Sequence, residues 1–488
     1  MQPRQCRVQT VNSMIQKAIV LATVLLGFSA DISPAAEVVS KDQAKPLSPG
    51  DIFRFTNIWT VHLSFTPEQW EAMEPKQRPR SQGGPGGARS FLQGPEGSRN
   101  GIASAFWFVF DYVHADLEFG TNCFKDVGVR YKGNGTFFSS QHSLKRSLKI
   151  DLHQFQTGPK LAGMSQLNLH NSVRDPSFMN EAVAYRLFRD GGVPASRTAY
   201  AKVYITVPGK YDRRYFGLYD LVEDVTKKFV EERFGMSKGA LLKPVTPNLF
   251  AELGDDWKSY NQTYDPKGSL SNEDKQWIIE FCQFATKAND GEFAAKLPDY
   301  LDIDNFARYM AITAWSSDLD GILGPGQNFY VYLHPKTHRL MFIPWDQDQT
   351  FGQFPRGTQE QRENLTIQKP WTGENRFLAR VFKAESFKKA YLAKLQEFNR
   401  TIFGPERIHP QVDELANVLR GPLREESPER LTALNKAAAG ENVAVFMGPG
   451  FASDIEVKPI KPFVVARSKS VGDQLAGKSD GQAVSRGF

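Results

Sequence analysis

A change of hydrophobic pattern near the middle of the chain constrains the fold more than any other feature. Between residues 103 and 223, runs such as 127–131 and 199–207 have strand-like sequence and are bounded by turn residues, which predicts β-strands. Beyond residue 270, apolar residues recur at helical spacing, as at Trp277, Phe281 and Phe284. The 488-residue chain is therefore predicted to be an α+β protein, sheet-rich in its N-terminal half and helix-rich in its C-terminal half.

Composition excludes several classes of protein. The 60 Lys and Arg residues exceed the 54 Asp and Glu residues by only six, far from the basic surface of a nucleic-acid-binding protein, so no nucleic-acid partner is expected. The charged fraction of 23% and the aromatic fraction of 12% are typical of a chain with a packed core. Three cysteines are too few for a disulfide framework or a four-thiolate zinc site. Cys123 and Cys282 remain a candidate pair in an oxidising compartment.

The N-terminus has the pattern of a signal peptide over residues 1–36. Basic residues precede the short apolar run 18–26, and small residues follow at 33–36. The alternative is an uncleaved N-terminal anchor. No later run approaches the length of a membrane span, so we expect an exported protein with no integral membrane segment after cleavage, in the periplasm, at the cell surface or secreted.

The remaining chain divides by composition. Residues 37–56 form a polar leader or linker, and 57–440 form the main folded unit. Within that unit, residues 76–101 are rich in Gly, Pro and Arg and are expected to be a disordered insertion. Residues 441–488 are expected to be a C-terminal extension with a flexible basic tail.

Acidic residues around a predicted hairpin mark the candidate site. Asp318 and Asp320 precede Asn328, and the hairpin 328–343 leads into Asp346 and Asp348. Hard oxygen ligands suit Mg²⁺ holding polyphosphate. A phosphoryl-transfer site needs a carboxylate for the attacking hydroxyl, and an Asn and a later Asp for metal. On the residues alone, a solvated loop or a structural Ca²⁺ site explains the pattern equally well.

Two further features lie upstream of this region. In the predicted strand 143–152, Lys145, Ser147 and Lys149 fall on one polar face. Gly133-Asn134-Gly135 stands between two predicted strands and predicts a glycine-rich turn, a pattern that usually marks only a hairpin. No Gly-x-Ser-x-Gly or His-Glu-x-x-His pattern occurs, so serine and zinc hydrolase chemistry have no support.

A resemblance joins these features. The chain resembles the spore-coat protein H (CotH) kinase family in seven ordered blocks, which begin at Leu167-Asn-Leu-His170-Asn171, Gly191-Gly-Val-Pro-Ala195, Phe216-Gly-Leu-Tyr219, Gly239-Ala-Leu-Leu-Lys243, Asp302, Gln327-Asn328 and Pro344-Trp345-Asp346. The blocks are collinear from about residue 125 to 355. The resemblance implies an atypical protein-kinase-like fold with two lobes, secreted, that binds ATP and Mg²⁺ and phosphorylates Ser or Thr of extracellular proteins. Mn²⁺ is an alternative metal.

The resemblance also implies roles for the acidic residues. Asp346 corresponds to a metal-binding Asp of the family, and Asp348 is a second ligand or orients the first. Asn328 is the other metal ligand. Asp320 is the preferred catalytic base and Asp318 the alternative, because the loop is long: Asp320 and Asn328 are eight residues apart, a longer gap than in the usual kinase loop.

The same resemblance implies a nucleotide-binding set. Lys149 is the candidate that bridges the ATP phosphates, with Lys145 as its alternative. Glu181 is a plausible partner for that lysine, and the backbone N–H groups of Gly133 and Asn134 are expected to cover phosphate.

Glu223 and His170 each have more than one interpretation. Glu223 belongs to a block near the nucleotide in the family, but Glu223 and Lys227 would simply pair if they were helical. His170 is interpreted as a hydrogen-bonded structural histidine rather than a metal ligand or base. The predicted function is transfer of the ATP γ-phosphoryl group to protein hydroxyls. The rival interpretation is a secreted binding protein that keeps a kinase-like fold without turnover.

Overall fold

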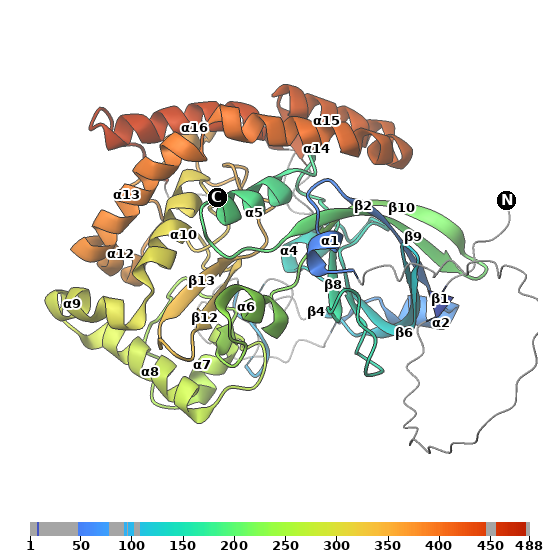
Figure 1. Ribbon diagram of the computed structural model, residues 1–488, viewed down its shortest axis with the longest axis horizontal. Helices are drawn as coiled ribbons and strands as arrows, with labels where there is room; N and C mark the ends of the chain where they lie inside the picture. The colour runs from blue at the N-terminus through green and yellow to red at the C-terminus, as the bar shows by residue number, and fades with distance from the viewer. Residues whose placement is uncertain are drawn as a thin grey trace, which may run out of the picture.

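The computed structural model describes residues 7–8, 47–77, 92–94, 96–101, 108–445 and 455–484. The predicted signal peptide lies outside these residues except for 7–8, and so do residues 37–46 of the predicted leader. Most of the predicted insertion 76–101 also lies outside them. Figure 1 shows the strands of the larger sheet on one side of the molecule and most helices of the C-terminal half on the other, with α14 and α15 reaching across both. The α+β class predicted from the sequence is confirmed.

The larger sheet closes on itself. Its strand order is β1-β6-β5-β2-β9-β10-β8-β7, and β6 also pairs with β7, so seven strands form a ring. The β2–β9 and β1–β6 pairs are parallel and the other pairs are antiparallel. The strands are β1 (Arg7–Val8), β2 (Ile58–Ser64), β5 (Val113–Phe119), β6 (Asn122–Tyr131), β7 (Leu148–Asp151), β8 (Gln166–His170), β9 (Thr198–Val207) and β10 (Tyr211–Val222).

Alternating residues of these strands build the first core. Along β5 every second residue is buried, and Val61, Leu63, Leu117, Val129 and Val203 belong to one apolar cluster. Because side chains of a strand alternate between its two faces, the ring buries one face of each strand. Ring closure also brings the ends of β6, β7 and β8 together, which positions polar side chains at one rim.

Helices and a small sheet build the second, larger core. The three-stranded sheet has the order β11-β12-β13, and two-stranded pairs are formed by β3 with β4 and β14 with β15. These strands are β11 (Ala240–Leu242), β12 (Phe329–Leu333), β13 (Leu340–Pro344), β3 (Lys76–Gln77), β4 (Phe108–Val109), β14 (Val443–Val445) and β15 (Ile455–Val457). The hairpin predicted at 328–343 is therefore confirmed.

The helices follow the predicted periodicity. Their bounds are α1 (Pro49–Ile52), α2 (Pro67–Ala72), α4 (Asn134–Ser139), α5 (Asn180–Asp190), α6 (Lys227–Phe234), α7 (Trp257–Tyr264), α8 (Asn272–Lys287), α9 (Asp290–Tyr300), α10 (Ile303–Trp315), α11 (Gln359–Glu363), α12 (Arg376–Lys383), α13 (Glu385–Thr401), α14 (Pro405–Glu426), α15 (Pro428–Ala439) and α16 (Ile460–Leu475). Ser271 caps α8, because its side chain accepts from the Asp274 N–H. None of the described helices is long and apolar enough to cross a membrane.

Two local predictions are wrong. Gly133-Asn134-Gly135 is not a hairpin turn: Gly133 has a φ of 84°, and the chain continues directly into α4. The left-handed conformation at Gly133 is one that glycine adopts without steric cost. The candidate pair of Cys123 and Cys282 does not form, because Cys282 is a free, buried thiol whose sulfur lies 3.4 Å from the Tyr264 hydroxyl.

The last helix is part of the second core. Arg467 on α16 is fully buried and donates hydrogen bonds to the carbonyl oxygens of Ala314, Trp315, Glu363 and Leu365. Burial lowers the pKa of Arg467 to about 9. The predicted extension 441–488 therefore contributes a helix that holds the C-terminal end of α10, directly before the loop of the candidate site.

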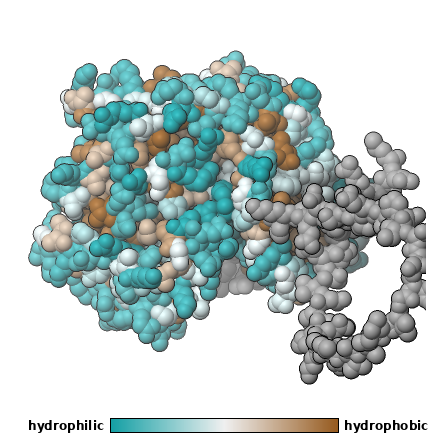
Figure 2. All heavy atoms as spheres, in the orientation of Figure 1, coloured by the Kyte–Doolittle hydropathy of each residue, from teal (hydrophilic) through white to brown (hydrophobic). Residues whose placement is uncertain are grey.

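Few large hydrophobic side chains of the described residues are exposed, because the apolar cores are buried. Figure 2 shows hydrophobic residues on this face only in small separate patches among hydrophilic ones. Large hydrophobic side chains exposed among the described residues are Leu47, Leu144, Leu253 and Val465. Single exposed apolar residues of this kind are common on soluble domains and mark no docking face.

Candidate functional site

A cavity of about 1050 Å³ lies where the rim of the closed sheet meets the β12–β13 hairpin. Its lining is strongly charged. Cationic side chains of the wall are Arg99, Arg130, Lys132, Lys149, Arg174, Lys227, Lys243, Lys267 and Arg356. Acidic side chains are Glu181, Asp220, Asp224, Asp320, Asp346 and Asp348. A concave site with so many convergent charges is suited to a ligand that carries several charges of its own.

The hairpin explains how the acidic residues come together. Phe329 pairs with Pro344 at the open end of the hairpin, so Asn328 and Trp345 are opposite neighbours, and the Trp345 N–H donates to the Asn328 carbonyl at 3.0 Å. Asn328 in turn donates from Nδ2 to the backbone and side-chain oxygens of Asp320, at 3.2 Å each. One short hairpin therefore joins the loop of Asp320 to Asp346.

Backbone geometry at the hairpin ends aims these side chains. Asn328 has a φ of 61° and Asp346 a φ of 55°, both in the left-handed region. Asn and Asp enter this region more readily than other residues with a side chain, and such conformations concentrate at functional sites. Helix α5 fixes the loop: the Asp346 N–H donates to the Tyr185 hydroxyl, and Asn180 Nδ2 donates to the Asp348 carbonyl, both at 2.9 Å.

The two candidates for the catalytic base occupy different places. Asp320 lines the cavity, and Gln327 donates to it at 3.0 Å. Asp318 lies behind the wall, 3% exposed, and accepts from Gln347 at 3.3 Å. Burial raises the pKa of Asp320 to about 7, against the lowering effect of Arg174, and raises the pKa of Asp318 to about 6. Of the two carboxylates, only Asp320 can reach a ligand in the cavity.

Of the two candidate lysines, one lines the cavity and the other does not. Lys149 lines the cavity and forms an ion pair with Asp224, Nζ to Oδ2 at 2.7 Å. Lys145 is absent from the lining and forms an ion pair with Glu426 of α14, also at 2.7 Å. Burial favours the neutral form of Asp224, but the Lys149 charge and hydrogen bond outweigh it and lower the pKa of Asp224.

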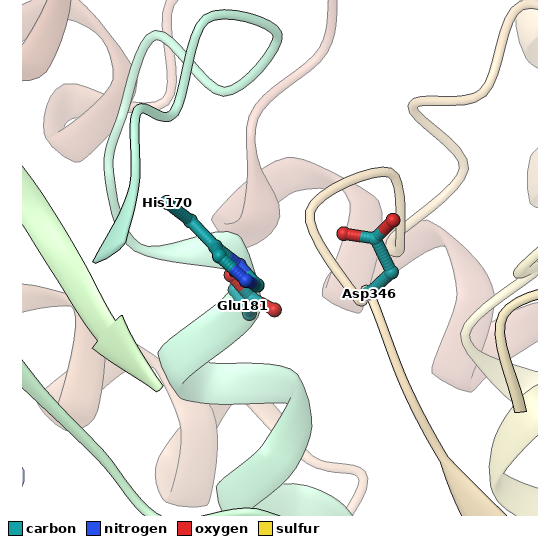
Figure 3. Close-up of side chains that lie close together, drawn as sticks. All are labelled: His170, Glu181 and Asp346. Carbon is teal, nitrogen blue, oxygen red and sulfur yellow. The ribbon is translucent and has the colours of Figure 1, made fainter. Parts of the chain in front are cut away.

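Glu181 does not pair with Lys149. Its Oε2 lies 2.7 Å from Nδ1 of His170, and Lys132 contacts Nε2 of the same ring. Figure 3 shows His170 at the end of β8 and Glu181 in the first turn of α5, across from Asp346 on the loop after β13. Ligand atoms of His170, Glu181 and Asp346 lie within 4.8 Å of one another, but both ring nitrogens of His170 are hydrogen-bonded, to Glu181 and to Lys132, so the ring offers no free ligand atom.

Burial dominates the electrostatics of this chain of contacts. It raises the pKa of Glu181 to about 8, with the Asp346 charge adding to the effect, and lowers the pKa of His170 to about 3 with help from Lys132. A neutral His170 that accepts from Lys132 donates its other N–H to Glu181. His170 is thus hydrogen-bonded at both nitrogens, in agreement with its interpretation as a structural histidine.

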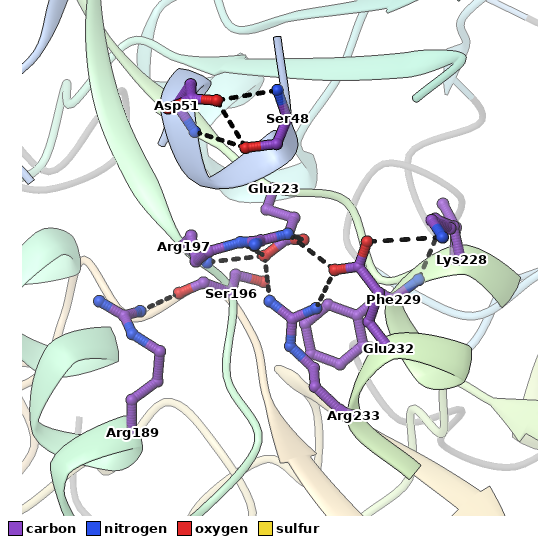
Figure 4. A network of polar contacts seen from close by, with 11 residues as sticks. Ser48, Asp51, Arg189, Ser196, Arg197, Glu223, Lys228, Phe229, Glu232 and Arg233 are labelled. Atoms are coloured by element: carbon purple, nitrogen blue, oxygen red, sulfur yellow. Dashed lines mark hydrogen bonds and ion pairs between the residues drawn. The ribbon is translucent and has the colours of Figure 1, made fainter. Parts of the chain in front are cut away.

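Of the remaining predicted residues, Gly133 lies at the cavity and Glu223 does not. Gly133 lines the cavity, whereas the side chain of Asn134 lies outside the described residues. Glu223 follows β10 and is not helical, so it does not pair with Lys227. Figure 4 shows Glu223 between Arg197 and Arg233, and its carboxylate oxygens lie 2.5 and 2.6 Å from these two guanidinium groups. This ion cluster borders a separate, smaller pocket and not the main cavity.

A family comparison agrees with this arrangement. The family model described as CotH kinase protein matches residues 129–470, well over half of the chain. The chain belongs to the CotH family. It is also similar to the inner spore coat protein H of Bacillus subtilis (strain 168), with 22% identity over 291 residues that cover 59% of this chain and 75% of that protein.

In this CotH protein the cavity contains residues that the sequence did not single out. Lys132, Lys243, Asp224 and Arg174 all line it. Lys243 ends one of the family-like blocks, and Lys132 directly precedes the Gly133 turn, so both carried a weak positional signal. Asp224 carried none, because its partner Lys149 is 75 residues away and only the pairing of β7, β8 and β10 brings the two together.

Proposed function

We propose that this protein is an exported atypical kinase that transfers the ATP γ-phosphoryl group to Ser or Thr hydroxyls of extracytoplasmic proteins in an Mg²⁺-dependent reaction. The observation that carries the proposal is the opposition of charges in one cavity: Lys149 on the sheet side, and Asp320, Asn328 and Asp346 on the hairpin side. Phosphoryl transfer requires cations for the phosphates and oxygen ligands for metal facing each other across the transferred group.

The acidic side fits a hard cation. Among the described residues, none donates a hydrogen bond to the side-chain oxygens of Asp346 or Asp348, and both bonds of the Asn328 amide use its nitrogen, which leaves Oδ1 for a ligand. Asp346, Asp348 and Asn328 would hold Mg²⁺ or Mn²⁺. When bound, the metal would neutralise charge on the phosphate oxygens.

The protein's own residues would perform the remaining steps. Asp320 accepts the proton of the attacking hydroxyl, and its raised pKa near 7 suits a general base at neutral pH. Asn328 and Gln327 orient its carboxylate by donating to it. Lys149, held by Asp224, has the role of the lysine that contacts phosphate in a kinase, with Asp224 in the place expected for Glu181.

We extend the proposal to the architecture. The closed sheet corresponds to the N-lobe of a kinase and the helices with the β12–β13 hairpin to its C-lobe, because the charged cavity lies where the two cores meet. The family match, whose description names a kinase, supports this assignment.

A transfer assay tests the function. The purified chain is incubated with γ-labelled ATP and Mg²⁺ or Mn²⁺, and label on the protein is measured. We expect label on the wild type and a loss of roughly a hundredfold or more in Asp346→Ala and in Asp320→Asn. Asp299→Ala, an exposed acidic residue on α9, is the matched control and should label as the wild type does. A wild type that binds ATP but never transfers label would support the non-catalytic binding protein instead.

A further inference from the structure

Two lysines of the cavity wall share one aromatic ring. Lys132 Nζ lies 5.3 Å from the centroid of Trp345, and Lys243 Nζ lies 5.2 Å from the same ring. Lys243 is also 5.3 Å from the ring of Tyr330, which meets Trp345 edge-on. Both lysines line the cavity, and Trp345 directly precedes Asp346. The two ammonium groups therefore stand beside the acidic loop of the site.

Neither of these ammonium groups has an anionic partner. Among the residues that the structure describes, no carboxylate lies within ion-pair distance of Lys132 or Lys243. The hydrogen-bond partner of Lys132 is the ring nitrogen of His170, whose other nitrogen is occupied by Glu181. Lys243 forms no hydrogen bond or ion pair among the described residues; its ammonium lies beside the rings of Tyr330 and Trp345 and within electrostatic range of Asp346. Aromatic faces stabilise a cation weakly and do not cancel its charge.

Two other lysines of the same wall are matched, whereas Lys227, which is exposed, forms no ion pair among the described residues. Lys149 pairs with Asp224 at 2.7 Å, and Lys267 pairs with Asp265 at 2.5 Å. An ion pair presents little net charge to a ligand, whereas an ammonium group with no carboxylate in contact keeps its charge available to an anionic ligand. A buried cation without a counter-ion is costly to the fold, so such a pair is expected to serve an anionic ligand.

We propose that Lys132 and Lys243, with Trp345 as their shared platform, form the polyphosphate-binding pair of the cavity and receive the terminal phosphates of the nucleotide beside Asp346. This inference rests on the proposed function and deepens it, because it moves the main electrostatic contribution to phosphate binding from Lys149 to two residues outside the predicted set. Lys149, whose charge is paired with Asp224, then makes the smaller contribution to phosphate binding. The ligand class is a polyphosphate anion, with or without an attached nucleoside.

Calorimetric titration of the full chain with Mg²⁺–tripolyphosphate and Mg²⁺–ATP tests the inference. Lys243→Met and Lys132→Met should each weaken binding of both ligands by roughly ten- to a hundredfold, the effect of losing a charge-assisted contact. Lys287→Met is the matched control, since it removes a lysine outside the cavity lining whose charge is already paired with Glu252 at 2.6 Å, and it should bind within about threefold of the wild type. Lys149→Met should fall between these limits.

Conservative replacements separate binding from folding. Lys243→Arg and Lys132→Arg keep the cation and should restore most of the affinity that the Met variants lose. If both Met variants bind tripolyphosphate as tightly as the wild type, or if only Lys149→Met loses binding, the lysine pair is not the polyphosphate site. A Met variant that fails to fold is replaced by its Arg counterpart and by Trp345→Leu, which should also weaken binding if the ring positions both ammonium groups.

The transfer assay distinguishes this inference from the proposed function. A wild type that binds tripolyphosphate through Lys132 and Lys243 but transfers no phosphate contradicts the kinase proposal and leaves the binding pair intact. A wild type that transfers phosphate, with Lys132→Met and Lys243→Met equally active and equally tight, contradicts the binding pair alone. A folded wild type that binds neither ligand contradicts both.

Discussion

Lys145 and Lys149 are four residues apart, and both form ion pairs at 2.7 Å, yet they serve different regions. Lys145 turns away from the cavity to Glu426 on α14, beneath the rings of Phe178 and Tyr219 at 4.5 and 5.5 Å. Lys149 points into the cavity toward Asp224. The sequence placed both on one polar face, and β7 begins only at Leu148, so Lys145 precedes the strand and leaves that face.

The partners decide what each pair does. Glu426 also accepts the Leu218 N–H at 2.7 Å, so the pair of Lys145 ties β10 to the end of α14. Burial lowers the pKa of Lys145 to about 8 in spite of the Glu426 charge. The pair of Lys149 borders a cavity that a ligand can enter. One pair is therefore expected to control stability and the other to control the site.

The largest expected effect tests the first half of this comparison. Lys145→Met leaves Glu426 buried with only Arg430, 3.7 Å away, and should lower the free energy of unfolding by about 3 kcal/mol in denaturant titrations. Polyphosphate affinity should not change. The double variant Lys145→Met, Glu426→Gln keeps an acceptor for the Leu218 N–H and should recover most of the loss. A single variant as stable as the wild type would contradict the structural role.

A smaller effect on stability is expected on the cavity side. Lys149→Met should lower the free energy of unfolding by about 1–2 kcal/mol, because water that enters the cavity can solvate Asp224 after its partner is removed. The measurement is the same denaturant titration, with Lys149→Met, Asp224→Asn as the compensated control. If Lys149→Met were as destabilising as Lys145→Met, the two pairs would not differ in role.

The smallest expected effect is on folding stability at acidic pH. Asp224 has a pKa below its ordinary value of 3.8, because the charge and hydrogen bond of Lys149 outweigh burial. Its stabilisation is therefore present above the unfolded-state pKa and is lost as pH falls through the lower folded-state pKa. The stability difference between wild type and Asp224→Asn should shrink below about pH 4. Asp299→Asn, exposed on α9, should show no such change; an unchanged difference for Asp224→Asn would contradict the pairing in solution.

The parts of the fold that sequence analysis could predict are local. Strand-like sequence located β9, and the β12–β13 hairpin lies where the sequence predicted it. Helix starts are harder to locate: Asp175-Pro176 has the sequence of a helix start, but Asp175 accepts the N–H groups of Ser177 and Asn180 in a separate turn, and α5 begins only at Asn180. A capping residue and the turn that competes with it have the same sequence signature.

The sequence could predict the contacts of the candidate site that lie within one hairpin, but not those between distant strands. Asp320, Asn328 and Asp346 meet because one short hairpin joins them, and hairpin register follows from local sequence. Lys132 meets His170 across 38 residues, and Lys149 meets Asp224 across 75. Those contacts depend on how β6, β7, β8 and β10 close the ring, which no local pattern encodes.

Arg467 makes the end of α10 depend on the last helix of the chain. Its guanidinium holds carbonyls of α10 that lie 152 and 153 residues earlier in the chain. Until α16 arrives, the end of α10 and the Asp318–Asp320 loop after it lack this clamp. The closed sheet and the β12–β13 hairpin contain no residue of α16, whereas the end of α10 and the loop of the candidate site have their full set of supporting contacts only when the final helix has docked.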